Sequence, residues 1–228
     1  AVRRSDDRAA VRTVLASVSD KTGLDAFVAG LRDLVSTLTI LSTGGTHAAI
    51  AAALGTAAGG CLRQVSDYTG QPEMQGGLVK TLDFRIYLGL LSETYNDAHQ
   101  ADLRRTGATA IDMVVVNLYP FEKTVAAAGV SPESARGNID IGGPCMVRAA
   151  AKNFHRVAVV TDPADYPAIL EELRSGGSAL SLDTRYALAR KAFRLTARYD
   201  AAIAEYLAAL PAAAMRAAYT VEPGEGAR

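Results

Sequence analysis

Two charged side chains within residues 137–153, GNIDIGGPCMVRAAAKN, are of the kinds that move protons. Asp140 stands between two isoleucines, and Lys152 ends a run of small residues. Pro144 suits the first turn of a helix, so we expect a helix to begin at the Gly-Gly pair before it. A carboxylate and an ammonium group near each other can transfer a proton and stabilise a developing oxyanion. The segment is therefore a candidate catalytic site.

The spacing within the predicted helix has two readings. Steps of three and four residues place Cys145, Arg148 and Lys152 on one face. Two cations in adjacent turns repel each other, which on a solvated face costs only a few tenths of a kcal/mol. If the face borders a pocket instead, Asp140 and a bound anion would offset the repulsion. The spacing leaves both readings open.

A second candidate segment is STGGT, which contains Thr43–Thr46. Glycines at a helix start let backbone amides approach an anion, the helix end is partly positive, and threonine hydroxyls add donors. The alternative is a plain strand-to-helix turn. Lys21, on the predicted neighbouring loop, favours a phosphate site because a phosphate needs a cation as well as amides.

The composition is that of a globular protein without overall charge. The 228 residues are 49% hydrophobic and 21% charged, which suits one sizeable α/β domain. The 24 basic and 24 acidic residues cancel, which argues against nonspecific binding to nucleic acid or a membrane surface. Two cysteines and three scattered histidines lack metal-ligand spacing, and no apolar run approaches the roughly 20 residues of a membrane helix. We expect a cytoplasmic protein that uses no metal.

Alternating apolar runs and helical patterns predict a parallel α/β fold. Residues 12–19 form an apolar run that is followed by a polar loop and a helical pattern from Leu24, and residues 37–45 begin a second such unit. Successive strand–helix units imply a parallel sheet with crossover helices, and ligands bind beyond the carboxyl ends of its strands. The predicted strands, five in all, are residues 12–19, 37–45, 61–69, 111–119 and 156–163.

Residues 70–91 have broken periodicity, and we interpret them as a long functional loop with a short helix. Ser181 is expected to cap a long final helix, and Asp200 falls in its apolar stripe, where it would lie at the edge or act as a cap. The predicted organisation is an N-terminal extension (1–11), one domain (12–210) and a tail or linker (211–228). The stripe consists of Tyr186, Ala189, Phe193, Thr196, Ile203, Leu207 and Leu210.

Seven motifs occur in one order over roughly residues 12–207: SVSDKTG, STGGT, VKTL, VVNLYPFEKTV, NIDIGGP, RAAAKN and KAFRLTARYD. Together they resemble the inosine monophosphate (IMP) cyclohydrolase domain of the bifunctional purine-biosynthesis enzymes. The resemblance implies a three-layer α/β/α fold of the methylglyoxal-synthase type, with a mainly parallel five-stranded sheet. It also implies an activity, the closure of 5-formamidoimidazole-4-carboxamide ribonucleotide (FAICAR) into IMP with loss of water, in the last step of de novo purine biosynthesis. It implies no cofactor.

The resemblance carries over to individual residues of this sequence. It implies that Lys152, Tyr119, Asp140 and Lys80 form the catalytic group. The substrate-binding residues that it implies are Ser19, Asp20, Lys21, Thr43, Gly44, Gly45, Thr46, Thr81, Val116, Asn117, Ile141, Gly142 and Gly143.

The cyclisation that the resemblance implies needs side chains of these chemical types. An amide nitrogen attacks a formyl carbon of the same molecule, so holding the substrate folded over supplies much of the rate. Proton transfer and oxyanion stabilisation remain to be supplied. We expect Lys152 to donate to the formyl oxygen and Asp140 to handle the amide proton. Tyr119 and Lys80 are expected to provide electrostatic support.

The sequence departs from the family pattern after the VKTL motif. The family usually reads Arg-Val-Lys-Thr-Leu-His-Pro and then His-Gly-Gly, whereas this chain has Leu78, then Asp83-Phe84, then Tyr87-Leu88-Gly89. The nucleotide contacts of Lys80 and Thr81 can persist, but the segment after them must pack differently. Substrate affinity and identity depend on that segment.

Two other functions remain as alternatives. A methylglyoxal-synthase-type lyase would share the phosphate loop but would carry a Gly-Gly-Asp acid motif, where this chain has Gly-Gly-Pro. A noncatalytic nucleotide sensor of the same fold would need the phosphate loop but not Tyr119, Asp140 and Lys152 together. The expected partners are a purine-precursor ribonucleotide, a second copy in a homodimer, and a formyltransferase domain or separate protein that supplies the formylated substrate.

Overall fold

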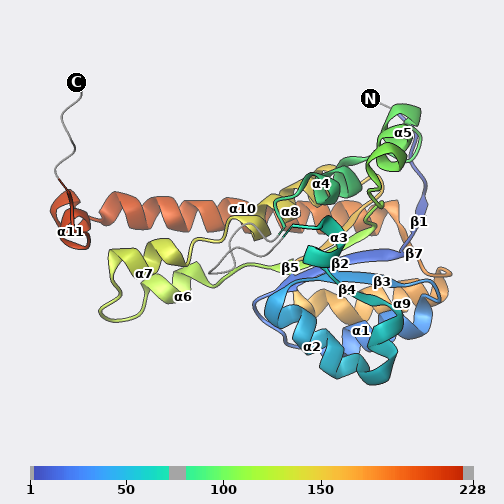
Figure 1. The fold of residues 1–228 in the computed structure, drawn as a ribbon, viewed down its shortest axis with the longest axis horizontal. Coiled ribbons are helices and arrows are strands. Elements are labelled where there is room, and N and C mark those ends of the chain that lie inside the picture. The colour runs from blue at the N-terminus through green and yellow to red at the C-terminus, as the bar shows by residue number, and fades with distance from the viewer. Residues whose placement is uncertain (1–2, 72–80, 223–228) are drawn as a thin grey trace.

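The computed structural model describes residues 3–71 and 81–222, and a five-stranded parallel sheet lies at its centre. The strand order is β4-β3-β2-β5-β6, and helices cover both faces of the sheet (Figure 1). This confirms the predicted α/β/α fold. The strands of the sheet are β2 (Thr13–Val18), β3 (Thr39–Ser42), β4 (Leu62–Gln64), β5 (Met113–Asn117) and β6 (Ala158–Val160).

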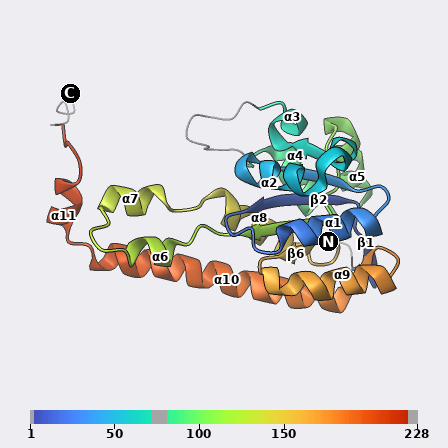
Figure 2. The same ribbon diagram turned by 90° about the horizontal axis from the view of Figure 1, so that it is seen from below.

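The helices form two layers, with α1, α2 and α9 on one face of the sheet and α4, α8 and α10 on the other (Figures 1 and 2). None of the described helices is both long enough and apolar enough to cross a membrane. The α-helices are α1 (Leu24–Leu34), α2 (Gly44–Leu54), α3 (Val65–Thr69), α4 (Phe84–Leu91), α5 (Asp97–Thr106), α6 (Phe121–Val125), α7 (Pro132–Gly137), α8 (Gly142–Lys152), α9 (Tyr166–Ser175), α10 (Leu182–Ala209) and α11 (Ala212–Ala217); 3-10 turns span Gly55–Gly60 and Pro163–Asp165.

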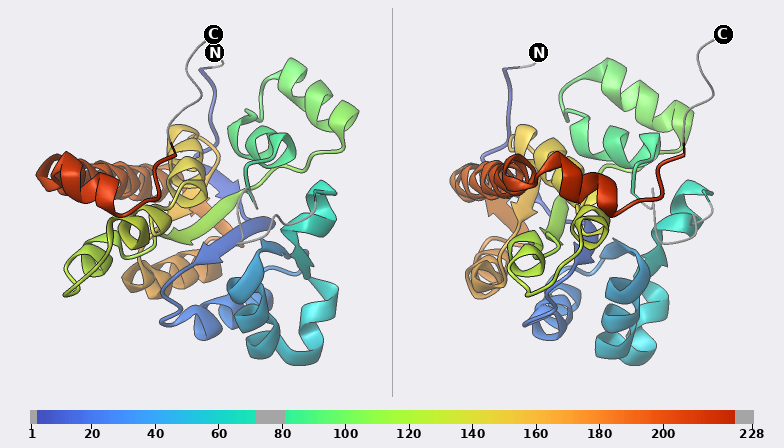
Figure 3. Two further views of the ribbon diagram at one scale, coloured as in Figure 1. Left: turned by 60° about the vertical axis from the view of Figure 1, so that its left-hand side comes forward. Right: turned by 90° about the vertical axis from the view of Figure 1, so that its left-hand side faces the viewer.

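The register of the sheet brings the carboxyl ends of the strands to one edge. Val18 of β2 lies opposite Asn117 of β5, and Ala16 lies opposite Ser42 of β3. Parallel pairing of this kind places the loops that follow β2, β3 and β5 next to one another. The end-on views in Figure 3 show the sheet between its two helical layers.

Hydrophobic periodicity explains the first helix and the central strand. Leu24, Phe27, Val28 and Leu31 of α1 are all buried, as their helical spacing predicts. The apolar residues of β5 are buried too, which is typical of a parallel strand covered on both faces. The predicted strands near 12–19, 37–45, 111–119 and 156–163 are confirmed, with shorter bounds.

The prediction for residues 61–69 is wrong over most of its length. Only Leu62–Gln64 pairs with β3, and Val65–Thr69 forms the short helix α3. Val65, Tyr68 and Thr69 are buried at helical spacing, and the Thr69 hydroxyl donates a hydrogen bond to the Val65 carbonyl (3.0 Å). Burial against the core therefore selects a helical turn where the alternating polarity favoured a strand.

The predicted loop at residues 70–91 contains a helix of eight residues, α4. Its N-cap is Asp83, whose carboxylate accepts a hydrogen bond from the backbone nitrogen of Arg85 (2.8 Å). Asp83 and Phe84 therefore begin a helix at the point where the family has a His-Pro turn. Leu78 and the rest of 72–80 lie outside the described residues.

Ser181 caps the long helix α10 as predicted, since its hydroxyl accepts a hydrogen bond from the Thr184 nitrogen (3.2 Å). The predicted apolar stripe is wrong in part. Ala189 and Thr196 are buried, but Tyr186, Phe193 and Leu207 are 48%, 40% and 54% exposed. The packed face is rotated toward Arg185, Leu188, Ala192 and Tyr199, which are buried where α10 packs on α8, β6 and α6. Asp200 is exposed.

Both ends of the predicted domain carry further structure. Within the predicted extension, β1 (Arg8–Ala10) pairs antiparallel with β7 (Ala179–Ser181). At the other end, α10 extends beyond the sheet with α6 and α7 beside it, and α11 follows (Figures 1 and 2). A small second core of Phe121, Tyr199 and Tyr206 side chains holds α6 against α10.

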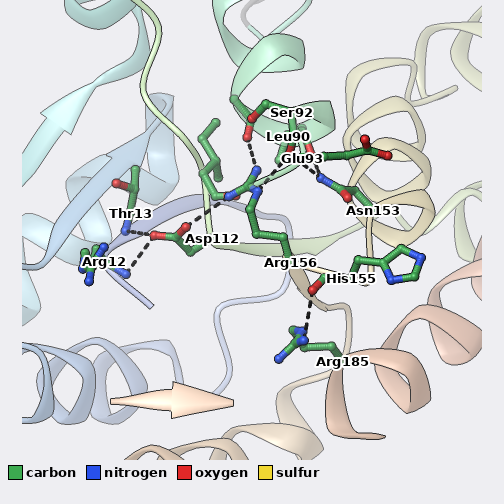
Figure 4. A network of polar contacts seen from close by, with 12 residues as sticks. Arg12, Thr13, Leu90, Ser92, Glu93, Asp112, Asn153, His155, Arg156 and Arg185 are labelled. Carbon is green, nitrogen blue, oxygen red and sulfur yellow. Dashed lines mark hydrogen bonds and ion pairs between the residues drawn. The ribbon is translucent and has the colours of Figure 1, made fainter. Parts of the chain in front are cut away.

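Two buried arginines bind backbone carbonyls near the edge of the sheet at which the strands begin (Figure 4). Arg156 donates to the carbonyls of Ser92 (3.0 Å) and Ile111 (3.0 Å) and pairs with Asp112 (3.1 Å). Asp112 in turn accepts hydrogen bonds from the backbone nitrogens of Arg12 (3.0 Å) and Thr13 (2.9 Å). Burial raises the pKa of Asp112 and lowers that of Arg156, so their pairing offsets part of the cost of desolvating both charges.

The second arginine, Arg185 of α10, is 1% exposed. It donates hydrogen bonds to the carbonyls of Phe154 (3.0 Å), His155 (3.0 Å) and Asp6 (2.7 Å). These bonds tie the N-terminal segment and the loop before β6 to α10. A buried guanidinium is stable here because its donors are satisfied.

Candidate active site

A cavity of about 580 Å³ opens at the carboxyl edge of the sheet, where β2, β3 and β5 end. The N-termini of α2 and α8 both border it, in the position at which parallel α/β folds bind ligands. Most of the predicted site residues therefore converge. Those that line the cavity are Ser19, Lys21, Thr43, Gly44, Gly45, Thr46, Thr81, Asn117, Tyr119, Asp140, Ile141, Gly142 and Gly143.

One end of the cavity is built like an anion cradle. Gly44 has a φ of +46°, a left-handed conformation that would strain a residue with a side chain, and it begins α2 with only Thr43 between it and the end of β3. The Lys21 ammonium lies close by, 4.0 Å from where a Cβ on Gly45 would stand. The first N–H groups of a helix lack intrahelical partners, so they and Lys21 can bind a phosphate together.

Thr46 has a structural role in addition to lining this end. Its hydroxyl accepts a hydrogen bond from the Val18 nitrogen (3.0 Å) and donates one to the Val18 carbonyl (3.1 Å). The start of α2 is thereby fixed to the end of β2. The Thr43 hydroxyl also lies 3.4 Å from that of Ser17, so a second contact joins the cradle to β2.

Asn117 positions the loop that carries Lys21. Its side-chain oxygen accepts hydrogen bonds from the backbone nitrogens of Ser19 (2.7 Å) and Asp20 (2.9 Å), and its amide donates to the Asp20 carbonyl (2.8 Å). The Asn117 side chain thus links β5 to the loop after β2 through three hydrogen bonds. This explains why an amide is needed at this position.

Asp140 is held at the N-terminus of α8. Its carboxylate accepts a hydrogen bond from the Gly143 nitrogen (2.9 Å). Burial raises its pKa, although the hydrogen bonds from the backbone of Gly143 and Tyr119 act in the opposite direction. A carboxylate whose pKa is raised toward the working pH is a better general base than an exposed one.

Glycine is required at the start of α8 for steric reasons. A Cβ on Gly143 would collide with the Asp140 carboxylate and would lie 2.8 Å from Leu118. A Cβ on Gly142 would lie 2.8 Å from the Thr81 hydroxyl. The Gly-Gly pair therefore lets Asp140 and Thr81 approach the helix end. Tyr119 stands at the mouth of the same cavity, 52% exposed.

Three predicted residues lie outside this cavity. The side chain of Val116 is buried in the core, and the Asp20 carboxylate accepts hydrogen bonds from Thr22 within its own loop (2.9 and 2.7 Å). Lys152 ends α8, ten residues after Gly142, or about 15 Å along the helix axis. The expected meeting of Lys152 with Tyr119 and Asp140 therefore does not occur within one chain.

The face with Arg148 and Lys152 is solvated. Both residues are exposed, and the Arg148 guanidinium lies 5.7 Å from the centre of the Phe193 ring on α10. Of the two readings of the helix spacing, the structure supports the solvated basic face. Lys80 lies outside the described residues, so its role stays a prediction.

Tyr199 of α10, to which no sequence pattern pointed, positions Asp140. Its hydroxyl accepts a hydrogen bond from the Asp140 nitrogen (2.8 Å) and lies 3.4 Å from the Asn138 carbonyl. Tyr199 belongs to the KAFRLTARYD motif, but nothing in the spacing connects it with residues almost sixty positions earlier. Other lining residues that were not predicted are Ser17, Val18, Leu82, Gly137, Ile139 and Met146.

The arrangement can bind a phosphorylated molecule at one end and transfer a proton at the other. Lys21 and the start of α2 form the anion-binding end, and Asp140 and Tyr119 form the reactive end. Within the described ranges, no group of three or more His, Cys, Asp or Glu side chains could hold a metal ion.

Comparisons with known proteins agree with this geometry. The family model described as "MGS-like domain" matches residues 23–145, more than half of the chain. The chain belongs to the MGS-like domain family. A second model, "AICARFT/IMPCHase bienzyme", matches residues 150–225, so the MGS-like segment is followed by one typical of that bienzyme.

Individual relatives of this MGS-like chain carry a more specific name. "Bifunctional purine biosynthesis protein PurH" from Chlorobium luteolum is 50% identical over 211 residues, which are 92% of this chain and 39% of the relative. The protein of the same name from Neisseria gonorrhoeae is 48% identical over 200 residues, 88% of this chain and 37% of the relative. The chain thus spans less than half the length of these relatives. The solved structure titled "Crystal structure of ForH" superposes with a TM-score of 0.74 at 35% identity, over 87% of this chain and 97% of that one.

Proposed function

We propose that this chain is an IMP cyclohydrolase, which closes FAICAR into IMP with loss of water. The observation that carries the proposal is the cavity itself, which joins a phosphate cradle at Lys21 and Gly44–Gly45 to a half-buried carboxylate at Asp140. The names of the relatives support the same activity. The formylated substrate would come from a formyltransferase activity, either in the remaining length of a longer chain or in a separate protein.

Each end of the cavity has a part in the proposed reaction. The cradle binds the 5′-phosphate and fixes the imidazole beyond it, so that the carboxamide nitrogen meets the formyl carbon within one bound molecule. Asp140 takes the proton of the attacking amide, because burial raises its pKa and so strengthens it as a base. The Tyr119 hydroxyl donates to the formyl oxygen as negative charge develops there, so that the attacked carbon carries a hydroxyl. That hydroxyl takes the proton held by Asp140 and leaves as water, while the formamide nitrogen returns its proton to the Tyr119 oxygen.

Lys152 fits this scheme only through a second copy of the chain. It is exposed at the far end of α8, so its ammonium is open to another molecule but distant from the cavity of its own chain. The proposed homodimer would therefore supply Lys152 to the partner's cavity. Lys80, next to the lining residue Thr81, is proposed to support the charge on the substrate.

The proposed activity is tested by measuring the turnover of FAICAR directly. FAICAR is mixed with the purified chain, and IMP formation is followed for wild type, Asp140→Asn and the control Asp102→Asn, which changes an exposed carboxylate on α5. Turnover should fall about a thousandfold in Asp140→Asn, since general-base catalysis contributes at most about 10⁴-fold. It should be unchanged in Asp102→Asn. Tight binding of IMP by a wild-type chain without turnover would instead indicate a nucleotide sensor.

A further inference from the structure

A second cavity, of about 710 Å³, lies next to the candidate active site and shares Asn117 with it. Ser19 and Asn117 line both cavities, so the two adjoin at these residues. The second cavity opens between the ends of β5 and β6 and the face of α10 that runs past them. Its volume is within the range of cavities that hold small molecules.

Cations from two helices converge on this cavity. Lys191, Arg194 and Arg198 recur at steps of three and four along α10, so they share one face, and Lys123 of α6 faces them. The acidic side chains in the lining are those of Asp20 and Asp162. The lining residues therefore carry four positive and two negative charges.

The ion pairs around the cavity leave part of this positive charge free. Lys191 is held by Asp162 (2.7 Å) and Asp165 (2.8 Å). Arg198 approaches Glu122 only at 3.9 Å, in an exposed pair that contributes little. Among the residues that the structure describes, Lys123 and Arg194 form no ion pair. An anion in this cavity would meet Arg194 without an ion pair and Arg198 in a weak one. It would also meet Lys123, whose charge acts on the Asp20 carboxylate only from beyond ion-pair distance.

The rest of the wall is apolar. Leu118 and Leu195 face the cavity, together with the rings of Pro120 and Pro163. Such walls suit a flat organic group, while arginine binds phosphate oxygens in a forked geometry. An organic phosphate with a ring system matches both features, whereas an inorganic ion would use only the cations.

We propose that this second cavity is a binding site for a nucleoside monophosphate or a similar organic phosphate, distinct from the substrate cavity. Arg194, Arg198 and Lys123 bind the phosphate, and the prolines and leucines hold the ring. The proposal does not depend on the cyclohydrolase activity, because it concerns the neighbouring cavity. The chain would then bind two ligands, one in this cavity and the proposed substrate at Thr43–Thr46.

The experiment uses calorimetric titration of the 228-residue chain with adenosine monophosphate. Gly45→Glu blocks the substrate cavity, because the new carboxylate repels phosphate and can pair with Lys21, and a Cβ has room there. In that background, Arg194→Glu and Lys123→Glu are tested separately, and Arg190→Glu is the control. Arg190 is an exposed residue of the same helix that lies over the Tyr186 ring (5.8 Å) rather than in the cavity.

We expect the Gly45→Glu protein to bind adenosine monophosphate with an affinity that falls as salt is added. Arg194→Glu and Lys123→Glu should each weaken this binding at least tenfold, and Arg190→Glu should change it less than twofold. Absence of binding to the Gly45→Glu protein would overturn the proposal, as would equal affinity in the Arg194 and Arg190 variants. Inorganic phosphate should bind at least tenfold more weakly, and equal affinity for it would overturn the assignment of an organic phosphate.

Discussion

The side-chain oxygen of Asn117 lies 2.7 Å from the backbone nitrogen of Ser19, so the end of β5 holds the loop after β2. With the two further bonds to Asp20, one amide side chain fixes the loop that carries Lys21. Asn117 also lines both cavities. The geometry of the candidate site thus depends on a residue that need not touch the reacting atoms.

Replacement of Asn117 should weaken substrate binding more than folding. Asn117→Ala removes three hydrogen bonds to the loop, and we expect KM for FAICAR to rise about tenfold, while stability falls by about 1–2 kcal/mol. Asn96→Ala is the matched control, since Asn96 caps α5 by accepting a hydrogen bond from His99 (3.2 Å). That variant should lose about 1 kcal/mol with KM unchanged. Equal KM values in the two variants would contradict the role given to Asn117.

Gly143→Ala should impair turnover through Asp140. The added methyl group collides with the Asp140 carboxylate and Leu118, so the carboxylate must move. A displacement of about 1 Å in a reacting group costs about a hundredfold in kcat. Gly59→Ala is the control, because nothing lies within 4 Å of a Cβ at Gly59. Steady-state kinetics on both variants tests this prediction, and a normal kcat in Gly143→Ala would contradict it.

The role of Lys152 can be tested by mixing variants. If each site combines Tyr119 and Asp140 of one chain with Lys152 of another, Lys152→Ala and Tyr119→Phe proteins should both be nearly inactive. Random exchange of subunits in an equal mixture should restore about a quarter of the wild-type activity, because half of the dimers then carry one intact site. Tyr119→Phe mixed with Asp140→Asn is the control and should restore nothing. A monomeric chain with full activity would contradict the shared site.

Arg156→Met should destabilise the protein in a pH-dependent way. It leaves Asp112 buried without its partner, and the cost should be about 3 kcal/mol at neutral pH. Burial already raises the pKa of Asp112, and loss of the guanidinium raises it further. The loss is therefore greatest where the carboxyl is ionised and shrinks as the pH falls and Asp112 takes up a proton.

Denaturant unfolding of wild type and Arg156→Met at neutral and acid pH measures this difference. Arg105→Met serves as the control, because Arg105 pairs with Asp102 on the exposed surface of α5 (2.8 Å). It should cost less than about 1 kcal/mol at either pH. A pH-independent loss in Arg156→Met would show that the arginine acts only through its bonds to carbonyls.

Local patterns determined much of this protein. Apolar runs separated by helical periodicity predicted the parallel sheet, because burial on both faces requires such runs. The TGGT turn and the Gly-Gly-Pro helix start could be recognised from residue type, since backbone geometry there depends on a missing Cβ and a fixed proline ring. Ser181 was recognisable as a cap for the same local reason.

The tertiary structure decided the contacts that the spacing of residues in the sequence does not encode. Only packing shows that Tyr199 binds the Asp140 backbone, that Asn117 lines two adjoining cavities, and that Lys152 lies far from Asp140. It also turned Val65–Thr69 into a helix and rotated the packed face of α10 away from Tyr186. These features arise between residues distant in sequence, and their free energies depend on which neighbours the fold supplies, so the sequence by itself left them open.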